Sequence, residues 1–381
     1  MLAFRIVFCI ISAQNTTIHL SGQVPENREN SKMIGKPYIA IALGLTSLLG
    51  SLLLGTSCRV DVANPELRLL DLEGDLRVHD PAIIRQDDTF YVFSTGGRPG
   101  GIIPVRRSKD LRRWVRCGCV LETLPAWAAR EIPGVRTAWA PDISFFNGKY
   151  HLYYSVSTFG KNNSAIGLAT NRTLDPDSPD YQWIDQGPVV RSAQGRDDWN
   201  AIDGNIAIED QNHLWLSWGS FWGGIKARRI DAGTGKLSTE DTTLFSLASR
   251  PRTGLQGAAS SEGAVEAPFI VKHRGYWYLF VSFDLCCRGA DSTYKIMVGR
   301  SRQITGPYVD RGGTRMMDGG GTLVVEATTE SWRGPGHCAV LQDSCGDYLI
   351  FHAYHGGTGR SELKLSPLAW KDGWPQAAPL P

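Results

Sequence analysis

The chain repeats one pattern of polar and apolar positions five times. In each copy a polar residue beside proline or glycine is followed by an apolar strand, a short turn and an aromatic strand. In the copy at residues 261–283, Glu266 stands among apolar neighbours, and an aromatic run from Tyr276 to Phe283 follows the turn. The markers recur roughly every 60 to 70 residues, and a fixed period indicates a repeat architecture. The five markers are Asp80, Asp142, Asp203, Glu266 and His337.

Each copy also carries the signals of a β-hairpin and of further strands. Turn residues such as Asn147-Gly148 and Arg274-Gly275 separate the apolar strand from the aromatic strand, as in hairpins. A further apolar segment follows each hairpin, at residues 103–107, 165–170, 225–230, 295–301 and 362–365. Trp114, Trp183 and Tyr308 indicate a fourth strand in three of the copies. Because propeller blades have four strands, we predict an all-β fold, a five-bladed β-propeller with four-stranded antiparallel blades.

The five markers are predicted to meet at one place. Each stands at the start of the innermost strand of a blade, and in a propeller these starts converge on the central channel at one face. Four carboxylates and an imidazole are costly to bury unless they are used or paired. Glycoside hydrolysis uses such a set, because it needs one protonated carboxylic acid and one ionised carboxylate.

Local sequence suggests a division of roles among these acids. Glu266 has apolar neighbours and the longer side chain, which favours a protonated general acid. Asp80 follows Arg77 and His79, which favour an ionised general base. Asp203 is expected to orient the acid and to raise its pKa by like-charge coupling. Glu262 competes for the acid role, but its serine and glycine neighbours predict a solvated loop.

Substrate contacts are expected from residues beside the markers. Aromatic side chains can stack on sugar rings, although most aromatics in these repeats build the core. The contacts that we predict are Trp139, Asp142, Asn200, Phe159, Phe221 and Trp222. His352 and His355 are left without a role, as core or rim residues.

Composition and cysteine spacing exclude some classes of protein. A formal net charge of +2, with 20% charged residues, argues against nucleic acid as the main ligand. None of the spacings among the eight cysteines resembles a zinc site. Cys338 and Cys345 could flank a hairpin and pair. The adjacent Cys286 and Cys287 are interpreted as a buried thiol pair without a role, because adjacent cysteines rarely bridge.

The N-terminal segment is predicted to be a leader. Residues 38–57 carry no charge and follow Lys32 and Lys36, which is typical of a secretory signal or a membrane anchor. Met33 is a candidate start, and Cys58 is a candidate site for lipid attachment. We predict a leader at 1–58, a linker at 59–75 and a catalytic propeller at 76–381. The product is expected to be secreted, or at the cell surface or in the periplasm, with membrane contact only through the leader.

An ordered set of motifs resembles glycoside hydrolase family 43 over roughly residues 72–375, and most closely its endo-1,5-α-L-arabinanases. The motifs that carry the resemblance are His79-Asp80-Pro81, Trp139-Ala140-Pro141-Asp142, Asn200-Ala201-Ile202-Asp203, Trp218-Gly219-Ser220-Phe221-Trp222-Gly223-Gly224, Val265-Glu266-Ala267-Pro268, Phe283-Asp284-Leu285-Cys286-Cys287-Arg288-Gly289 and Gly334-Pro335-Gly336-His337. Any one triplet is weak evidence, whereas the ordered set is specific. Gly204 departs from the pattern, since proline usually follows the third carboxylate.

The resemblance implies a five-bladed propeller that inverts configuration at the anomeric carbon. It implies that Asp80 is the general base, Glu266 the general acid and Asp203 the residue that tunes the acid's pKa and holds the sugar. It places His337 beside a calcium ion coordinated mostly by water, with no organic cofactor. The expected substrate is arabinan or an arabino-oligosaccharide, and the expected state is a monomer.

Three functions remain open at this point. The first is endo-acting hydrolysis of α-1,5-linked arabinan, and the second is an exo-acting arabinofuranosidase or β-xylosidase of the same family. The third is a carbohydrate-binding propeller without catalysis, which has no need of three converging acids. An inverting enzyme should hold the carboxyl groups of Asp80 and Glu266 about 6.5–9.5 Å apart.

Overall fold

The computed structural model describes residues 67–98, 100–251 and 263–381. The expected leader, Cys58, the first part of the expected linker and Glu262 lie outside the described residues. Within the described part of the chain, no helix is both long enough and apolar enough to cross a membrane.

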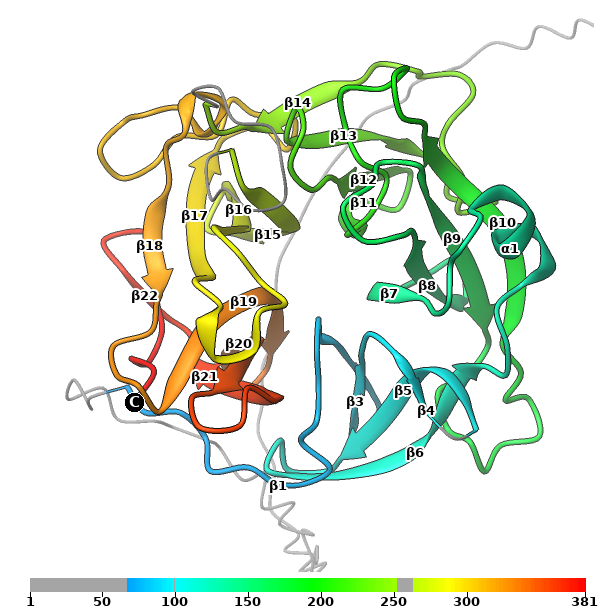
Figure 1. Ribbon diagram of the computed structural model, residues 1–381, viewed down its shortest axis with the longest axis horizontal. Helices are drawn as coiled ribbons and strands as arrows, with labels where there is room; N and C mark the ends of the chain where they lie inside the picture. The colour runs from blue at the N-terminus through cyan, green and yellow to red at the C-terminus, as the bar shows by residue number, and fades with distance from the viewer. Residues whose placement is uncertain (1–66, 99, 252–262) are drawn as a thin grey trace, which may run out of the picture. The chain divides into compact units, whose positions relative to one another are not determined.

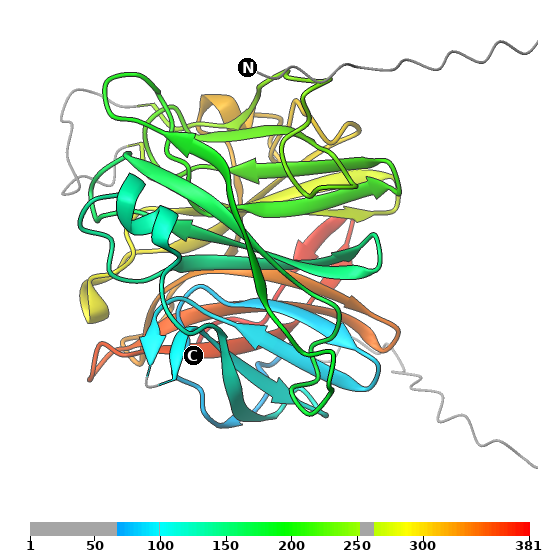
Figure 2. The ribbon, with the colours of Figure 1, turned by 90° about the vertical axis from the view of Figure 1, so that its right-hand side faces the viewer.

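Five antiparallel sheets are arranged in a ring, and each sheet is one blade (Figure 1). In the side view, the strands run across the thickness of the ring (Figure 2). From the centre outward, blade 1 has β2 (Ala82–Gln86), β3 (Thr89–Phe93), β5 (Gly101–Ser108) and β6 (Arg113–Leu121), with the short β4 (Gly97–Arg98) beside β5. Blade 2 has β7 (Trp139–Phe146), β8 (Lys149–Val156), β9 (Ser164–Asn171) and β10 (Ile184–Ser192).

The remaining three blades follow the same order. Blade 3 has β11 (Asn205–Asp210), β12 (His213–Trp218), β13 (Ile225–Ile230) and β14 (Phe245–Ala248). Blade 4 has β15 (Val265–His273), β16 (Tyr276–Phe283), β17 (Lys295–Ser301) and β18 (Thr322–Val325). Blade 5 has β19 (Trp332–Asp343), β20 (Gly346–His355) and β21 (Ser361–Pro367). The other short elements are α1 (Ala126–Glu131), the 3-10 turns η1 (Gly289–Asp291) and η2 (Met316–Asp318), and the two-stranded sheet of β22 (Ala369–Lys371) and β23 (Trp374–Gln376).

The predicted five-bladed propeller is confirmed, with two differences in its outer strands. Tyr308 lies outside the fourth strand of blade 4, which is β18 instead, because its segment forms only an isolated bridge with β17, between Val309 and Arg300. Blade 5 has three strands of its own where four were expected.

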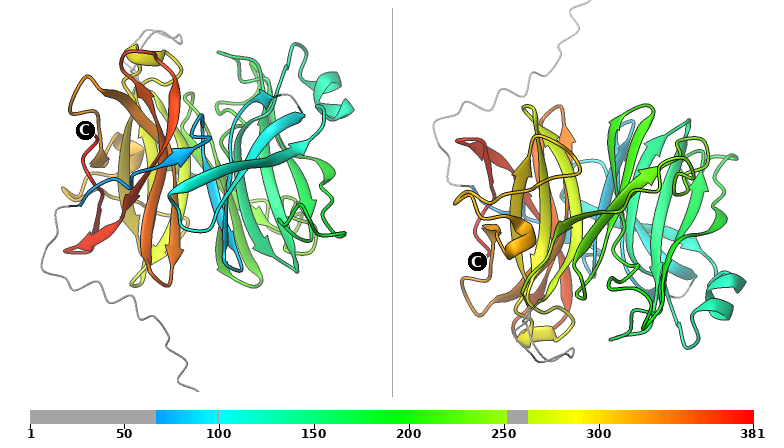
Figure 3. Two further views of the ribbon diagram at one scale, coloured as in Figure 1. Left: turned by 90° about the horizontal axis from the view of Figure 1, so that it is seen from below. Right: turned by 90° about the horizontal axis from the view of Figure 1, so that it is seen from above.

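The described start of the chain lies against blade 5 and blade 1. The Leu70 N–H donates to the Leu365 carbonyl at 2.9 Å, and the Leu363 N–H donates to the Leu76 carbonyl at 2.9 Å. A few residues further on, β1 (Glu73–Gly74) pairs in parallel with β6. Figure 3 shows this blue segment between the orange and red blade 5 and the cyan blade 1. Residues 70–76 therefore join the last blade to the first and close the ring.

The apolar core lies between neighbouring blades. Five clusters of buried side chains can be traced in the described residues, and each contains strand residues from two adjacent blades. Between blades 1 and 2, for example, Tyr91 and Phe93 pack with Leu152 and Tyr154. The aromatic strands of the repeats therefore pack in the core between blades. This packing fixes the positions of the inner strands relative to one another.

Candidate active site

One cavity of about 920 Å³ collects residues from all five blades. It is lined by the starts of the inner strands and by the loops around them. Of the residues predicted from the sequence, those that line it are Asp80, Trp139, Phe159, Asn200, Asp203, Phe221, Trp222, Glu266 and His337. Asp142 is absent from its lining.

A recurring backbone feature builds the wall of this cavity. Each inner strand has, within it or two residues before it, one non-glycine residue with a φ between 44° and 59°, a conformation that such residues adopt rarely. These residues are Asp80, Ala140, Asp203, Ala267 and His337. Each of their backbone N–H groups donates to a side chain of the preceding blade, in order His352 Nδ1, Thr95 Oγ1, Ser155 Oγ, Asp203 Oδ2 and Ser282 Oγ, at 2.6–3.2 Å.

The backbone feature shows that two markers are offset from the others. Glu266 lies one residue before Ala267, so it still projects into the cavity. Asp142 lies two residues after Ala140, and its carboxylate turns to blade 3 instead. It accepts hydrogen bonds from Asn205 Nδ2 at 3.2 Å and from the Ile206 N–H at 2.9 Å. The Asp142 side chain is therefore a tie between blades in this structure, and burial raises its pKa to about 7.

Asp80 lies among three imidazoles. His79 Nδ1 is 2.8 Å from Asp80 Oδ2, and His337 Nδ1 is 3.3 Å from Oδ1. His352 Nδ1 is 3.7 Å from Oδ1, and the Thr95 hydroxyl donates to Oδ2 at 2.6 Å. Burial alone would raise the pKa of Asp80, but His79 and His337 outweigh it and hold the pKa well below its usual range. Asp80 is therefore ionised.

His79 is oriented by contacts on both ring nitrogens and on its face. Its Nε2 is 2.7 Å from the Tyr354 hydroxyl, and its ring stacks on His352 with 4.1 Å between centroids. Burial lowers the pKa of His79, but the Asp80 charge more than offsets this, so the pKa is raised. His352 is fully buried, and burial lowers its pKa well below the usual value. The hydrogen-bond geometry fits a His79 that donates from Nδ1 to Asp80.

Glu266 lies in a contrasting environment. It is buried, and Ser220 Oγ–H donates to its Oε2 at 2.5 Å. Burial raises its pKa to about 7, the Asp80 charge adds to the rise, and the Ser220 hydrogen bond opposes it. Asp203 accepts the Ala267 N–H, and burial together with the charges of Glu266 and Asp80 raises its pKa well above the usual value. At neutral pH the cavity therefore holds an ionised Asp80 and a proton within the Glu266 and Asp203 pair.

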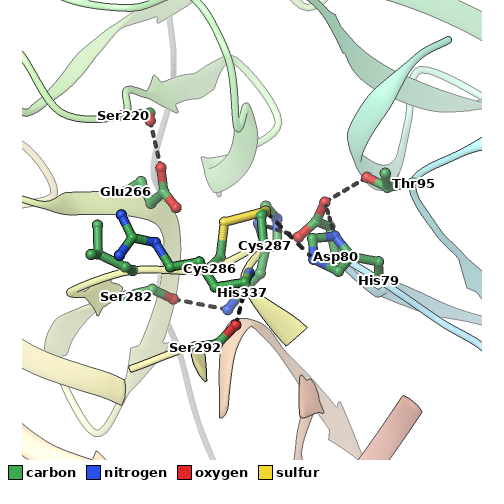
Figure 4. The surroundings of a disulfide bond; sticks show 12 residues. His79, Asp80, Thr95, Ser220, Glu266, Ser282, Cys286, Cys287, Ser292 and His337 are labelled. Carbon is green, nitrogen blue, oxygen red and sulfur yellow. Dashed lines mark hydrogen bonds and ion pairs between the residues drawn. A yellow bond between two sulfur atoms is a disulfide. The ribbon is translucent and has the colours of Figure 1, made fainter. Parts of the chain in front are cut away.

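Cys286 and Cys287 form a disulfide in the same cavity, so the interpretation as a thiol pair is wrong. Figure 4 shows it in view between the carboxyl groups of Glu266 and Asp80. The suggested pairing of Cys338 with Cys345 is also wrong, because both thiols are free. Cys338 stands five residues before the end of β19, about 16 Å at a strand's rise, whereas bonded cysteines have Cα atoms less than about 7 Å apart.

Several residues of the site carry no marker in the repeat pattern. They are Thr95, Ser220, His352, Tyr354 and the two cysteines. Thr95, His352 and Tyr354 come from the second strand of a blade or from its end. The signal that could have revealed His352 is a polar residue inside an aromatic strand, because Ser155 and Ser282 occupy matching places in blades 2 and 4.

An ionised carboxylate and a protonated carboxylic acid in one aromatic-lined cavity are suited to acid–base hydrolysis of a glycosidic bond. His355 takes no part, since its Nδ1 accepts the N–H groups of Gly357 and Thr358 in an exposed turn. His79, Asp80 and His352 also place ligand atoms within 4.8 Å of one another.

Known proteins are similar to this chain in sequence and in fold. The chain is 44% identical over 303 residues to the extracellular exo-α-(1→5)-L-arabinofuranosidase ArbA of Cellvibrio japonicus, covering 78% of this chain and 86% of that protein. It is 39% identical over 300 residues to the extracellular endo-α-(1→5)-L-arabinanase 1 of Bacillus subtilis, covering 78% and 87%. The solved structure of Cellvibrio cellulosa α-L-arabinanase complexed with arabinohexaose matches with a TM-score of 0.74 and 43% identity, over 79% of this chain and 95% of that one. The model of glycosyl hydrolases family 43 matches residues 74–375, and the chain belongs to that family, so it is a glycoside hydrolase.

Proposed function

We propose that the protein is an inverting hydrolase that cleaves α-1,5-L-arabinofuranosidic bonds within arabinan chains. The observation that carries the proposal is the contrast between two carboxyl groups of one cavity. Asp80 is kept ionised by imidazoles, whereas burial brings the pKa of Glu266 to about 7. The arabinan-cleaving activities named for the relatives support this choice of substrate.

The proposal gives each group its own step. Glu266 protonates the oxygen of the leaving sugar, while Asp80 removes a proton from the water that attacks the anomeric carbon from the opposite face. His79 and Thr95 orient the Asp80 carboxylate through their bonds to Oδ2. Asp203 lies in the same cavity, where it shares a proton with Glu266 and contacts the sugar.

The proposed substrate contacts follow from the cavity lining. Trp139, Phe159, Phe221 and Trp222 offer apolar faces to the sugar rings, and Asn200 offers an amide. Phe159 is 73% exposed, so its ring is accessible to a sugar that enters the cavity. Asp142 affects the substrate only indirectly, because both of its oxygens are engaged with blade 3.

The side chains around His337 offer few ligands for the expected calcium ion. Calcium prefers about 6–8 oxygen ligands, whereas the described side chains closest to His337 Nδ1 offer one carboxylate, that of Asp80. This donor set fits an ion that keeps most of its water shell and takes one contact from His337. Such an ion would add positive charge beside Asp80 and favour its ionised form.

Export of a monomeric enzyme completes the proposal. The two relatives described above are extracellular by name, which supports export of this chain through its N-terminal segment. Attachment of lipid at Cys58 remains part of that proposal.

The products formed from linear arabinan test the proposed reaction. An endo-acting enzyme should release a mixture of oligosaccharides early, whereas an exo-acting arabinofuranosidase should release one short product from the chain end. Proton NMR during the first minutes should show the β-anomer at the new reducing ends, before mutarotation. An initial excess of the α-anomer would contradict inversion.

The pH profile should follow the two pKa shifts. Asp80 must be ionised, and its lowered pKa keeps the base active down to about pH 4 or below. Glu266 must be protonated, so kcat/KM should fall as pH rises through about 7. In Ser220→Ala, the ionised form of Glu266 loses a hydrogen bond, so the alkaline limb should move to higher pH.

Ser217→Ala is the matched control for that shift. Ser217 lies on the neighbouring strand β12, and its hydroxyl donates to the Asn205 carbonyl at 3.4 Å. Its profile should overlay that of the wild-type enzyme. An alkaline limb that stays in place in Ser220→Ala would remove Glu266 from the acid role.

A further inference from the structure

The Cys286–Cys287 disulfide lies where the reaction should take place. Both cysteines line the cavity together with Asp80 and Glu266, and Cys287 is an exposed residue. Figure 4 shows the S–S bond in view between the two carboxyl groups. The bond that is cleaved must lie between the acid and the base, inside the cavity that the two cysteines help to line, and Cys287 Sγ is 3.9 Å from Nε2 of His79, the neighbour of the base.

The chemistry of this wall suits the face of a sugar. Bonded sulfur atoms carry no S–H donor and present a soft, polarizable surface. The C–H groups of a furanose ring need such a surface, since its hydroxyls take the polar contacts. Adjacent bonded cysteines close an eight-membered ring, which holds both sulfur atoms in place when the substrate is absent. The wall is therefore preorganised, and little ordering is needed on binding.

The same disulfide is connected to the general base. The Cys287 N–H donates to the Tyr354 hydroxyl at 2.9 Å, and that hydroxyl is 2.7 Å from His79 Nε2. His79 Nδ1 in turn contacts Asp80 Oδ2 at 2.8 Å. Cys287 has a φ of 65°, which a non-glycine residue seldom adopts without support. The closed disulfide ring restricts the backbone at Cys287, whose N–H is bonded to Tyr354.

We propose that the Cys286–Cys287 disulfide is a working part of the substrate site, packing against the sugar whose bond is cleaved and positioning Asp80 through Tyr354 and His79. The inference rests on the proposed function, in which Asp80 is the base. It makes the enzyme sensitive to reduction, and the oxidising compartment expected of an exported protein keeps the bond closed.

Reduction of the folded wild-type enzyme tests the proposal directly. A water-soluble phosphine gives its electron pair to the disulfide and becomes a phosphine oxide, with the oxygen from water. The two cysteines take up two protons and become thiols. The reduced enzyme should show a KM for arabinan raised about tenfold and a lower kcat. Reoxidation with oxidised glutathione should restore both values. The described cysteines outside this bond are free thiols, so the phosphine leaves them unchanged.

Variants separate the wall from the connection to Asp80. Cys286→Ser/Cys287→Ser should resemble the reduced enzyme and should no longer respond to phosphine. Tyr354→Phe keeps the wall but removes the hydroxyl between Cys287 and His79, so kcat should fall roughly 10- to 100-fold with KM unchanged. Cys345→Ser, at an exposed free thiol in the β19–β20 turn, is the control and should match the wild type.

The outcomes distinguish this inference from the proposed function. Unchanged kcat and KM in reduced wild-type enzyme, with thiol titration showing the bond open and circular dichroism showing the fold intact, would overturn the inference. The proposed function would stand, because it depends on Glu266 and Asp80. A wild-type enzyme inactive on arabinan would contradict both. If the double serine variant does not fold, the reduced wild-type enzyme decides the question.

Discussion

Glu266→Gln is expected to lower the hydrolysis of arabinan about 10³-fold or more. The amide has nearly the same shape as the carboxylic acid, and its oxygen can still accept the hydrogen bond from the Ser220 hydroxyl. It cannot deliver a proton to the leaving sugar oxygen. Without that proton the sugar would have to leave as an alkoxide, which is a poor leaving group because the sugar hydroxyl is a very weak acid. The loss should lie in kcat, with KM for arabinan close to that of the wild type.

The leaving group provides the sharpest check on this result. A dinitrophenyl arabinofuranoside releases a stable phenolate and needs little protonation, so Glu266→Gln should hydrolyse it at a rate much closer to that of the wild type. Glu209→Gln is the control, because Glu209 is exposed on β11 and bonds to Trp215 Nε1. Equal losses on arabinan and on the activated substrate would assign Glu266 a role other than general acid.

The fold could be predicted because its signal repeats. Each blade carries its own hairpin turn and its own aromatic strand, and a missed strand in one copy does not hide the period. Blade 5 was harder, since the segment that joins it to blade 1 comes from residues 70–76 at the other end of the described chain. A period in the sequence does not show which distant segment completes a sheet.

The site was predictable where a residue stood at, or next to, the positive-φ position of an inner strand. Asp142 shows the limit of that rule, because a shift of two residues from the left-handed Ala140 turns its carboxylate to the next blade. Tyr354 and Thr95 reach Asp80 or His79 from other strands, and no spacing rule connects them to those residues. The disulfide was not predicted, because bonds between adjacent cysteines are rare and this rarity was given more weight than the position of the two cysteines beside the site.

Asp80→Asn is expected to lower kcat about 10⁴-fold on both arabinan and the activated substrate. The amide cannot accept the proton of the attacking water, and that step is needed whatever the leaving group. This common loss separates the base from the acid, whose removal spares the activated substrate. Azide needs no deprotonation, so it should restore turnover of Asp80→Asn on the activated substrate and give an azide product of inverted configuration.

The electrostatics of the cavity give Asp80→Asn a second, independent signature. The Asp80 charge raises the pKa values of both Glu266 and His79, so its removal should lower both. In azide-rescued turnover of a substrate with a poor leaving group, the alkaline limb should therefore move to lower pH.

Asp142→Asn is the matched control, since this buried carboxylate ties two blades without lining the cavity. The variant should have a lower Tm, because loss of a buried hydrogen-bond acceptor costs about 1–3 kcal/mol of stability. Its kcat should stay near the wild-type value. A kcat loss in Asp142→Asn as large as in Asp80→Asn would mean that damage to the fold, and not loss of the base, explains both.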